Sequence, residues 1–478
     1  MVHGCTLTTR HYEAQARVLA ESFLAHNPGS RFSVLMIGYS PDELPNGERF
    51  EVFVPADVGI DERELKRRAT MYITQGLASS LKPNLIATLL SRGSGAVLYI
   101  DADGCVYDDL TELAELAERH SLLLSPHTLD PHPIARSEPA DPVWRQDSPE
   151  QIILRSGLIN AGLLGAGPRS GPFLEWWAQR TARRCVFDLP LGLALSQTWL
   201  TLAMTLFEHH VLLDRGCNVA GWNLQARDVS WVGERPTIDG APLRHFHFAG
   251  GFDPERPHRI TPSAKNASWW PSLDERPGTA RVAREYADRL IAHGYREAHA
   301  APPLYDVMPG GASIEPWMRA TYRIALVEAE QGGSEEPPNP FSDGAERFAE
   351  WLQRRAYDRL EGGVVASPAF SDAWDAGTDE ILTAAMDSGR LLARIKELDG
   401  IRDEAVEWAE REAAELQRAV EAIAARDESI DALRSELAGM RASMDSVWRS
   451  PSWRVTKPLR AIRAGTASAA TILRRARK

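Results

Sequence analysis

The feature that most constrains the fold is an alternation of strand and helix signals over residues 1 to about 262. The predicted strands are Cys5–Thr8, Phe32–Ile37, Phe50–Val54 and Ala96–Ile100, and the predicted helices between them are Tyr12–His26 and Glu62–Leu90. Strands that alternate with helices in this way predict an α/β fold with a largely parallel sheet. In such sheets, ligands bind beyond the carboxyl ends of the strands.

One of these strands runs directly into two acidic residues. In VLYIDADG, Asp101 and Asp103 follow Ile100, and Gly104 would ease a turn there. Two such carboxylates repel each other unless a hard divalent cation lies between them, and a cation of this kind commonly also holds a diphosphate. The alternative role for an aspartate here is to cap the N-terminus of the next helix, predicted over 110–120. That role is assigned to Asp108 or Asp109, because capping needs only one residue.

Length and composition exclude several classes of protein. The chain has 478 residues, which is too long for one ordinary domain. Its composition, with 44% hydrophobic and 25% charged residues, indicates a soluble globular protein. A net charge of −12 argues against a general nucleic-acid binder. The four cysteines are widely spaced, which favours a reducing compartment over a zinc site or a disulfide framework. The N-terminus shows no signal peptide and no apolar run approaches the roughly 20 residues of a membrane span, so a cytoplasmic location is expected, with at most a peripheral membrane contact.

The residue composition and the spacing of apolar residues change three times along the chain, which predicts four regions. Residues 1–265 form the α/β domain, and residues 266–378 form a small helical accessory domain with a boundary near 263–280. Its predicted helices are Ala280–His293, Ile314–Ala329 and Gly344–Ala356, and a proline-rich loop covers residues 332–344. A third region, 388–447, and a basic tail, 448–478, complete the chain.

The third region carries a seven-residue apolar repeat. Its first seam is Ile395, Ala409, Leu416, Ile423, Ile430, Leu437 and Met444. Such a repeat, with charges between the seams, predicts a coiled coil and therefore a homo-oligomer. The alternative is a single long helix packed on the body.

The last segment has no acidic residue after position 445. Arginines and lysines alternate there with apolar residues, among them Trp448 and Trp453. Basic residues interleaved with tryptophans favour contact with an anionic membrane surface. A solvated tail or a docking peptide is the alternative.

Residues 1 to about 260 resemble the metal-dependent GT-A glycosyltransferases of the glycogenin and lipopolysaccharide-galactosyltransferase type. The resemblance rests on the order and spacing of seven segments: CTLTTRHYEAQARVLAESFLAHNPGSRFSVLMIG, SSLKPNLIATLL, VLYIDADGCVYDDL, SGLINAGLLGAG, LSQTWL, NVAGWNL and HFHFAGG. It implies a GT-A domain, which is a Rossmann-like fold that binds a nucleotide-sugar. It also implies transfer of a sugar, a hexose by expectation, from a nucleoside-diphosphate sugar to a hydroxyl group.

The resemblance also implies roles for individual residues. Asp101, Asp103 and His247 would bind Mn²⁺ or Mg²⁺, with His245 as a rival ligand, and Asp101 would also lie near the nucleotide ribose. Gly250 completes an H-x-x-G motif with His247. The remaining implied positions are Thr8, Thr9 and Tyr12 for the nucleoside, Lys82 near the donor, Asn160 and Gly162 on the sugar or acceptor side, and Gln197 as the glutamine of a D-Q segment. Each also has a structural reading: a core histidine for His247, a helix start for Lys82 and a turn for Asn160.

One departure from the family matters, because Ser196 stands where many relatives carry an aspartate before Gln197. An inverting enzyme needs a carboxylate base for the acceptor hydroxyl, so retention is favoured. The departure also supports an alternative of another class, an inactive or weakly active scaffold that binds a nucleotide-sugar and organises other enzymes. A nucleotidyltransferase is disfavoured because residues 4–12 lack a glycine-rich phosphate loop.

The C-terminal regions carry a weaker resemblance. A coiled coil followed by SPSWRVTKPLRAIR is similar to the ends of some bacterial envelope-polysaccharide glycosyltransferases, and NPFSDGAERFAEWL resembles a helical module found with them. This implies a glycan or lipid-linked glycan acceptor at the inner face of the cell membrane. For the transferase domain, a UDP-sugar is the expected donor.

Overall fold

The computed structural model describes residues 2–40, 42–131, 149–188, 192–260, 273–300 and 304–361, together with 438–439, 441–443, 446 and 449. The chain divides into two compact units, and residues from Val2 to Arg359 belong to the first. The few helical residues between 438 and 449 belong to the second unit and are exposed. Apart from these, the predicted coiled coil and basic tail lie outside the described residues. Among the described helices, none has the length and apolar character that crossing a lipid bilayer requires.

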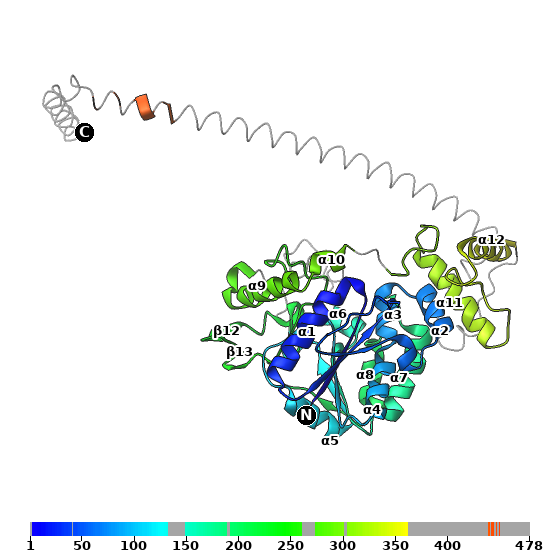
Figure 1. The fold of residues 1–478 in the computed structure, drawn as a ribbon, viewed down its shortest axis with the longest axis horizontal. Helices are drawn as coiled ribbons and strands as arrows, with labels where there is room; N and C mark the ends of the chain where they lie inside the picture. The colour runs from blue at the N-terminus through cyan, green and yellow to red at the C-terminus, as the bar shows by residue number, and fades with distance from the viewer. Residues whose placement is uncertain are drawn as a thin grey trace, which may run out of the picture. The chain divides into compact units, whose positions relative to one another are not determined.

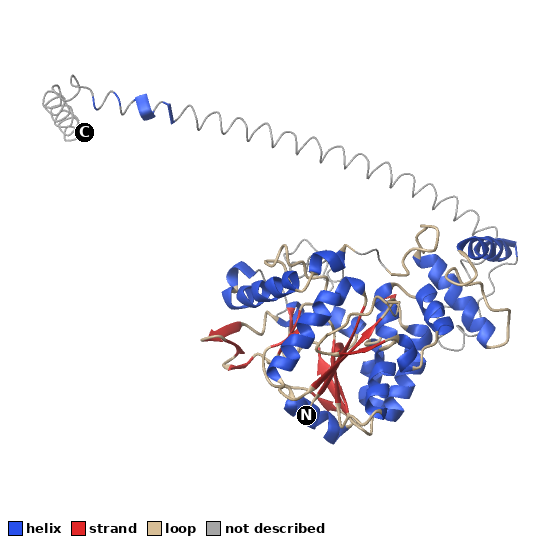
Figure 2. Cartoon of the chain, in the orientation of Figure 1, coloured by secondary structure: helices blue, strands red, loops and turns tan. Residues whose placement is uncertain are grey.

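A seven-stranded sheet forms the centre of the first unit (Figures 1 and 2). In spatial order its strands are β10 (His210–Val211), β6 (Leu122–Pro126), β7 (Ile159–Ala166), β4 (Val97–Ile100), β1 (His3–Thr8), β2 (Arg31–Met36) and β3 (Glu51–Phe53). Strand β7 is antiparallel to both neighbours, and the other pairings are parallel. The prediction of an α/β fold with a largely parallel sheet is confirmed.

Both faces of the sheet are covered by helices, as the continuous burial of its strands requires. In β4, Val97 and Tyr99 pack into one core while Leu98 and Ile100 pack into the other, because successive side chains point to opposite faces. The helices of the first face are α2 (Glu62–Met71), α3 (Thr74–Ser80), α4 (Lys82–Ser91), α7 (Gly171–Arg184) and α8 (Thr198–Leu206). Those of the second are α1 (Glu13–His26) and α5 (Thr111–His120).

Smaller sheets surround the main one. The sheet that bears on the site has the order β11 (Val219–Ala220), β15 (His245–His247), β5 (Gly104–Val106). The others are the hairpin β8 (Phe187–Asp188) with β9 (Leu193–Ala194), and the antiparallel set β12 (Val229–Val232), β13 (Arg235–Ile238) and β14 (Ala241–Pro242). Helix α6 (Pro149–Ser156) precedes β7.

The prediction of one helix over 62–90 is wrong, because the stretch forms three helices, α2, α3 and α4. The break between α2 and α3 falls at Tyr72 and Ile73, whose backbones are extended. The hydroxyl group of the buried Tyr72 donates to the carbonyl of Thr181 at 3.0 Å. A second break precedes Pro83, which lies in the first turn of α4, where its missing N–H costs nothing. Tertiary contacts of Tyr72 therefore override local helix propensity.

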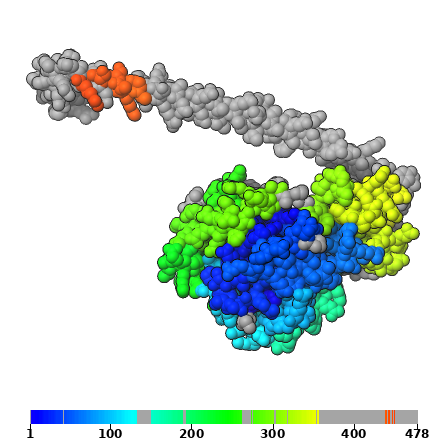
Figure 3. Space-filling view, viewed as in Figure 1, coloured from blue at the N-terminus to red at the C-terminus, as the bar shows by residue number. Residues whose placement is uncertain are grey.

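Four helices follow the small sheets: α9 (Pro277–Ala292), α10 (Tyr295–His299), α11 (Pro316–Glu330) and α12 (Ala345–Glu361). Tyr286 of α9 stacks on Phe248 with ring centroids 3.8 Å apart, within a core that α1 also lines. Tyr322 and Leu326 of α11 and Phe348 of α12 are fully buried in the core of the first sheet face. Figure 3 shows α9–α10 and α11–α12 on either side of the blue N-terminal segments. The hydrophobic cores thus continue across residue 265, and the division into two domains there stays a prediction.

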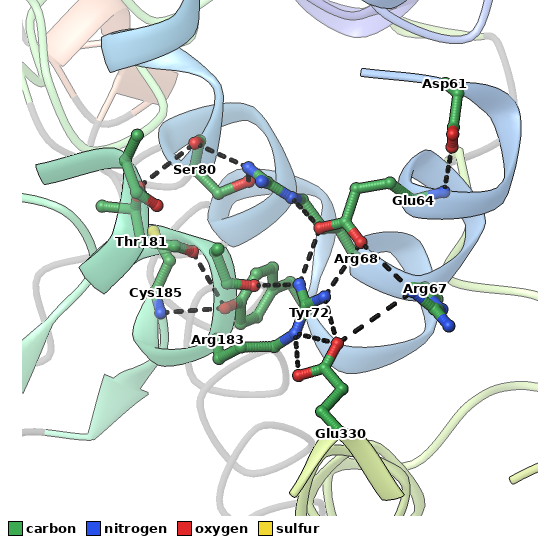
Figure 4. Close-up of polar contacts among 12 residues, drawn as sticks. Asp61, Glu64, Arg67, Arg68, Tyr72, Ser80, Thr181, Arg183, Cys185 and Glu330 are labelled. Carbon is green, nitrogen blue, oxygen red and sulfur yellow. Dashed lines mark hydrogen bonds and ion pairs between the residues drawn. The ribbon is translucent and has the colours of Figure 1, made fainter. Parts of the chain in front are cut away.

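Polar contacts also fasten α11 to the helices of the sheet (Figure 4). Arg183 of α7 donates to both carboxylate oxygens of Glu64 on α2, at 2.6 and 2.9 Å, and to Glu330 on α11 at 2.6 Å. In the proline-rich loop, the buried amide of Asn339 donates to Thr70 of α2 at 2.9 Å and to Tyr322 of α11 at 3.1 Å. The NPF segment therefore acts as a connector between α2 and α11.

Candidate active site

The two aspartates of the D-x-D segment lie in a tight turn between β4 and β5. The backbone N–H of Asp101 donates to the carbonyl of Gly162 on β7 at 2.8 Å, and the N–H of Gly104 donates back to the carbonyl of Asp101 at 2.9 Å. The carbonyl of Asp103 accepts the N–H of Phe248, just after β15, at 2.8 Å. Both carboxylates are therefore held at the carboxyl end of a central strand, where the sequence predicts a ligand.

His247 joins this pair through the small sheet. In the antiparallel pairing of β15 with β5, His247 is opposite Gly104. Its Nε2 atom lies 3.1 Å from Asp103 and 3.9 Å from Asp101. One ligand atom from each of the three residues falls within 4.8 Å of the others, which is within reach of a single cation.

The other nitrogen of the His247 ring is also engaged. Nδ1 lies 3.4 Å from the amide oxygen of Asn218, which can only accept a hydrogen bond. This contact favours a proton on Nδ1, so Nε2 is the nitrogen available to a cation held between the carboxylates. A histidine oriented in this way by a second hydrogen bond is the usual arrangement of a metal ligand.

Two glycines make room for this arrangement. A Cβ atom on Gly104 would lie 2.5 Å from Nε2 of His245, and one on Gly162 would lie 2.3 Å from Cε1 of His247. Gly162 therefore contributes space behind the histidine, and it is not among the residues that line the pocket described below.

Lys82 and Tyr99 set the charge of Asp101. Lys82 Nζ lies 2.8 Å from Oδ1 of Asp101, and the Tyr99 hydroxyl donates to the same oxygen at 2.7 Å. Burial alone would raise the pKa of Asp101, but Lys82, His247 and the hydrogen bonds together hold it below its ordinary value. Burial alone would likewise lower the pKa of His247, whereas Asp103 and Asp101 raise it. Asp101 is thus kept as a carboxylate.

The rival histidine, His245, is not part of the cluster formed by Asp101, Asp103 and His247. Its side chain is fully buried, and within the described residues neither ring nitrogen has a hydrogen-bond partner. Burial lowers its pKa to about 3, with His247 adding to the shift. The structure brings His247, and not His245, to Asp101 and Asp103.

The donor set fits a divalent metal ion. Two carboxylates and one neutral imidazole nitrogen are ligands that Mn²⁺ and Mg²⁺ accept, and the imidazole is 3% exposed. The residues present therefore match the metal implied by the sequence resemblance.

The cluster opens on a pocket of about 620 Å³. The sequence-predicted residues that line it are Thr8, Thr9, Tyr12, Lys82, Asp101, Asp103, Asn160, Gln197, His247 and Gly250. Thr8 and Thr9 come from the end of β1, and Tyr12 from the 3-10 helix after it. Gln197 is the residue just before α8, and its side-chain amide donates to the carbonyl of Ser156 at 3.0 Å.

Asn160 has a local task as well as a place in the pocket wall. Its amide oxygen accepts the backbone N–H of Gly162 at 2.8 Å, which is the turn contact expected of a structural asparagine. Its amide nitrogen lies 3.2 Å from Nε2 of His127. Ser196, at the position of the family aspartate, is buried and also lines the pocket.

Several residues that line the pocket are not predicted from the sequence. His127 directly follows β6, and its pKa is lowered to about 4 by burial. His127 could have been predicted from its position after a strand, because the carboxyl ends of parallel strands meet at one edge of the sheet. Trp222 packs edge-on to both His127 and His247, with ring centroids 5.4 and 5.3 Å apart. Asp306 also lines the pocket, and no pattern in the sequence links it to the sheet.

No protein-family model and no curated protein matches the chain. Solved structures of glycosyltransferases do align with it. The galactosyltransferase LgtC, in complex with donor and acceptor sugar analogues, is 18% identical, with 60% of this chain and 95% of LgtC covered and a TM-score of 0.34. The glycosyltransferase GlyE of Streptococcus pneumoniae TIGR4 is 15% identical, with coverages of 64% and 66% and a TM-score of 0.33. Mouse xyloside xylosyltransferase 1 is 12% identical, with coverages of 52% and 97% and a TM-score of 0.30. All three of these proteins are named as glycosyltransferases.

Proposed function

We propose that this chain is a metal-dependent glycosyltransferase that moves a sugar, a hexose, from a UDP-sugar to an acceptor hydroxyl group. The observation that carries the proposal is the cluster of Asp101, Asp103 and His247 at the carboxyl edge of the sheet, opening on a pocket of about 620 Å³. That volume is in the range of small-molecule sites. The placement is where an α/β sheet binds a nucleotide ligand.

Asp101, Asp103 and His247 would hold Mn²⁺ or Mg²⁺. When bound, the cation would supply Lewis-acid stabilisation of the negative charge on a diphosphate leaving group. Lys82 is buried beside Asp101 and keeps that carboxylate ionised for its ligand role. The ordered β4–β5 turn and the Asn218 contact preorganise the ligands.

The remaining lining residues divide the pocket between nucleoside and sugar. Thr8 at the end of β1, with Thr9 and Tyr12 just after it, would contact the nucleoside. Asn160 and Gln197 would contact the sugar and acceptor. For the stereochemical course we propose retention, because Ser196 offers no carboxylate base and Asp101 and Asp103 are committed to the cation.

The sequence of the C-terminal regions supports a proposal for the cellular context of this activity. The heptad region 388–447 would form a homo-oligomer, and the basic, tryptophan-containing tail 448–478 would hold the enzyme at the inner face of a bacterial cell membrane. The acceptor would then be a glycan or lipid-linked glycan of envelope polysaccharide synthesis.

The second candidate is a scaffold that binds a nucleotide-sugar without turning it over. Ser196 favours it, since a position that is acidic in many relatives has no ionisable group here. The complete Asp101–Asp103–His247 cluster argues for the enzyme.

The test is binding and hydrolysis of a panel of UDP-, GDP- and dTDP-sugars, with and without Mn²⁺. The informative variant is Asp103→Asn, and the matched control is Asp108→Asn, which removes the same charge five residues further along, outside the cluster. Metal-dependent hydrolysis of one donor should fall by about 100-fold or more in Asp103→Asn and stay unchanged in the control. Binding without hydrolysis in the wild type favours the scaffold, and absence of binding to every donor contradicts both candidates.

A further inference from the structure

One carboxylate in the pocket wall does not come from the sheet or its connections. Every other lining residue falls between Leu7 and Gly251, whereas Asp306 belongs to the stretch that leads into α11. It lies in contact with Thr74 at the start of α3, which lines the same pocket. The accessory helical region therefore contributes directly to the pocket.

The backbone around Asp306 is closed into a short hairpin. Val307 and Ser313 form an antiparallel bridge, and the N–H of Ile314 donates to the carbonyl of Asp306 at 3.0 Å. Tyr305, just before, has a φ of 59°, a left-handed conformation that is costly for a tyrosine. Backbone strain of this kind persists only where its surroundings hold it, and it concentrates at functional sites.

The same stretch is anchored against the main sheet. The side chain of Leu304 fills the space above Gly38, since a Cβ atom there would lie 2.2 Å from Leu304 Cδ2. Gly38 follows β2 and has a φ of 82°. The ring of Tyr305 packs edge-on against Phe341, with centroids 5.0 Å apart. Asp306 is thus held at the carboxyl edge of the parallel strands, on the side that faces the pocket.

One oxygen of the Asp306 carboxylate is held by a buried guanidinium group. Arg319 of α11 is 4% exposed and donates through Nη2 to Oδ1 of Asp306 at 3.0 Å. Nη1 of Arg319 donates to the backbone carbonyls of Ala69 and Tyr72. The guanidinium group therefore locks the carboxylate to the break between α2 and α3.

The second oxygen of Asp306 keeps capacity to accept a hydrogen bond. Its protein neighbour is the hydroxyl group of Thr74, at 3.2 Å. That hydroxyl group has one hydrogen, and it lies closer, at 2.6 Å, to the carbonyl of Leu304. The side chain of Asp306 is 37% exposed. Oδ2 is therefore a fixed, negatively charged acceptor that borders the pocket.

We propose that Oδ2 of Asp306 accepts a hydrogen bond from a sugar hydroxyl group in the pocket, and that Asp306 thereby positions the sugar and contributes to sugar specificity. The inference rests on the proposed glycosyltransferase function. A carboxylate repels the diphosphate and needs an uncharged donor, and a sugar hydroxyl group is such a donor; unchanged UDP binding in the test below separates it from the donors of the nucleoside. A hydroxyl–carboxylate hydrogen bond is short and about twice as strong as a neutral one. The hydroxyl group belongs to the donor sugar or to the acceptor sugar.

The variant that tests this is Asp306→Asn. Its amide oxygen can still accept from Arg319, while an NH₂ group that cannot accept replaces Oδ2. Asp343→Asn is the matched control, because Asp343 lies in the same accessory region, accepts the backbone N–H of Asn339 at 2.8 Å and is outside the pocket. Asp306→Glu, which keeps the charge but displaces it by one methylene group, is the second variant if Asp306→Asn melts early.

Three measurements are compared in the wild type and the variants: binding of UDP with Mn²⁺ by calorimetry, hydrolysis of UDP-galactose, UDP-glucose and UDP-N-acetylglucosamine, and transfer from the active donor to methyl glycosides. We expect UDP binding to stay within about twofold. A donor-sugar contact lowers kcat/KM for hydrolysis by about 10- to 100-fold. An acceptor contact leaves hydrolysis unchanged and lowers transfer by that factor.

Rates with deoxy-sugars distinguish a direct contact with the sugar from a purely structural role of Asp306. One single-deoxy analogue of the affected sugar should lower the wild-type rate by the same factor and have no further effect on Asp306→Asn. The inference is overturned if Asp306→Asn, with a normal melting temperature, hydrolyses and transfers like the wild type. If the wild type binds no donor, the proposed function fails and this inference fails with it.

Discussion

Gly104 stands opposite His247 in the antiparallel pairing of β5 with β15, and this register sets the imidazole 3.1 Å from Asp103. The strand that follows the D-x-D turn thus delivers the third ligand of the candidate metal site through backbone hydrogen bonds. The side chain of His245, which lies on β15 like His247, occupies the space that a Cβ atom on Gly104 would need.

Replacing Gly104 by alanine should therefore disturb the cluster without removing any ligand. The new Cβ would lie 2.5 Å from His245 and 3.0 Å from Ile100, so β5 must shift or its neighbours must move. We expect a loss of about 1–3 kcal/mol in the free energy of unfolding, and weaker Mn²⁺ binding by calorimetry. Gly171→Ala is the control, because nothing lies within 4 Å of its Cβ position. Unchanged Mn²⁺ affinity in Gly104→Ala would show that the register is not needed.

Replacing Lys82 by methionine should leave a buried charge without its partner. The Lys82 side chain is 5% exposed and lies 2.8 Å from Asp101. Removing one partner of a buried ion pair typically costs about 3–5 kcal/mol. Since a divalent cation would replace the lost positive charge, Mn²⁺ should raise the melting temperature of Lys82→Met more than that of the wild type. Equal increments in differential scanning calorimetry would contradict this.

The stability of the protein should fall on mild acidification, partly through His3. Burial, followed by the charge of Arg31, lowers the pKa of His3 to about 4, and its ring nitrogens lie 2.7 and 2.8 Å from the hydroxyl oxygens of Ser94 and Ser33. Because the folded-state pKa lies below the ordinary value of 6.5, the unfolded chain binds more protons between pH 6.5 and 4. The stabilising contribution is therefore present above pH 6.5 and is lost as the pH falls towards 4, with a slope of up to about 1.4 kcal/mol per pH unit.

Urea unfolding from pH 7 to pH 4 measures this effect. The difference in free energy of unfolding between the wild type and His3→Gln should shrink as the pH falls. His258→Gln, at an exposed histidine, should follow the wild type at every pH. A difference between the wild type and His3→Gln that stays constant across this window would rule out the assignment.

The accessory helices should unfold together with the sheet. Leu326 of α11 is fully buried in the core that also contains Val97 and Tyr99. Leu326→Ala should cost about 2–5 kcal/mol and shift a single unfolding transition, seen alike by circular dichroism and tryptophan fluorescence. Leu206→Ala, at a leucine that is 56% exposed, should cost less than about 0.5 kcal/mol. Two separated transitions in Leu326→Ala would indicate independent domains and support the boundary at residue 265.

The C-terminal proposals are tested by shortening the chain. A chain that ends at residue 445 should lose flotation with anionic liposomes while keeping its oligomeric state. A chain that ends at residue 387 should also become monomeric in analytical ultracentrifugation, because the heptad repeat supplies the proposed contact. Unchanged flotation of the chain without residues 446–478 would contradict the proposal that the tail binds the membrane surface.

Much of the site could be predicted because it follows local rules. The apolar run before Asp101 fixes a buried strand, and the end of that strand fixes where the carboxylates lie. His247 required the H-x-x-G resemblance, since its approach to Asp103 depends on the pairing of strands that are about 140 residues apart in the sequence. The helix breaks at Tyr72 and Pro83 depend on side-chain burial and on a proline position, which helical periodicity does not report.

Asp306 lay beyond any such rule. Its place in the pocket follows from the packing of Leu304 on Gly38 and from the hydrogen bond of Arg319 to Ala69, two contacts that join segments more than 230 residues apart. Arg319 then holds Asp306 within the same stretch of chain. Nothing in the composition or spacing around Asp306 marks it as a pocket residue. Contacts of this length are decided by the whole tertiary structure.

That arrangement has a consequence for protein synthesis. The ribosome delivers the chain from the N-terminus, and every strand of the main sheet is complete once Val211 has emerged. The Arg319 guanidinium group that holds Asp306 emerges more than 100 residues later. A nascent chain can therefore assemble its sheet well before its pocket wall is closed, and the finished pocket belongs only to a chain translated beyond α11.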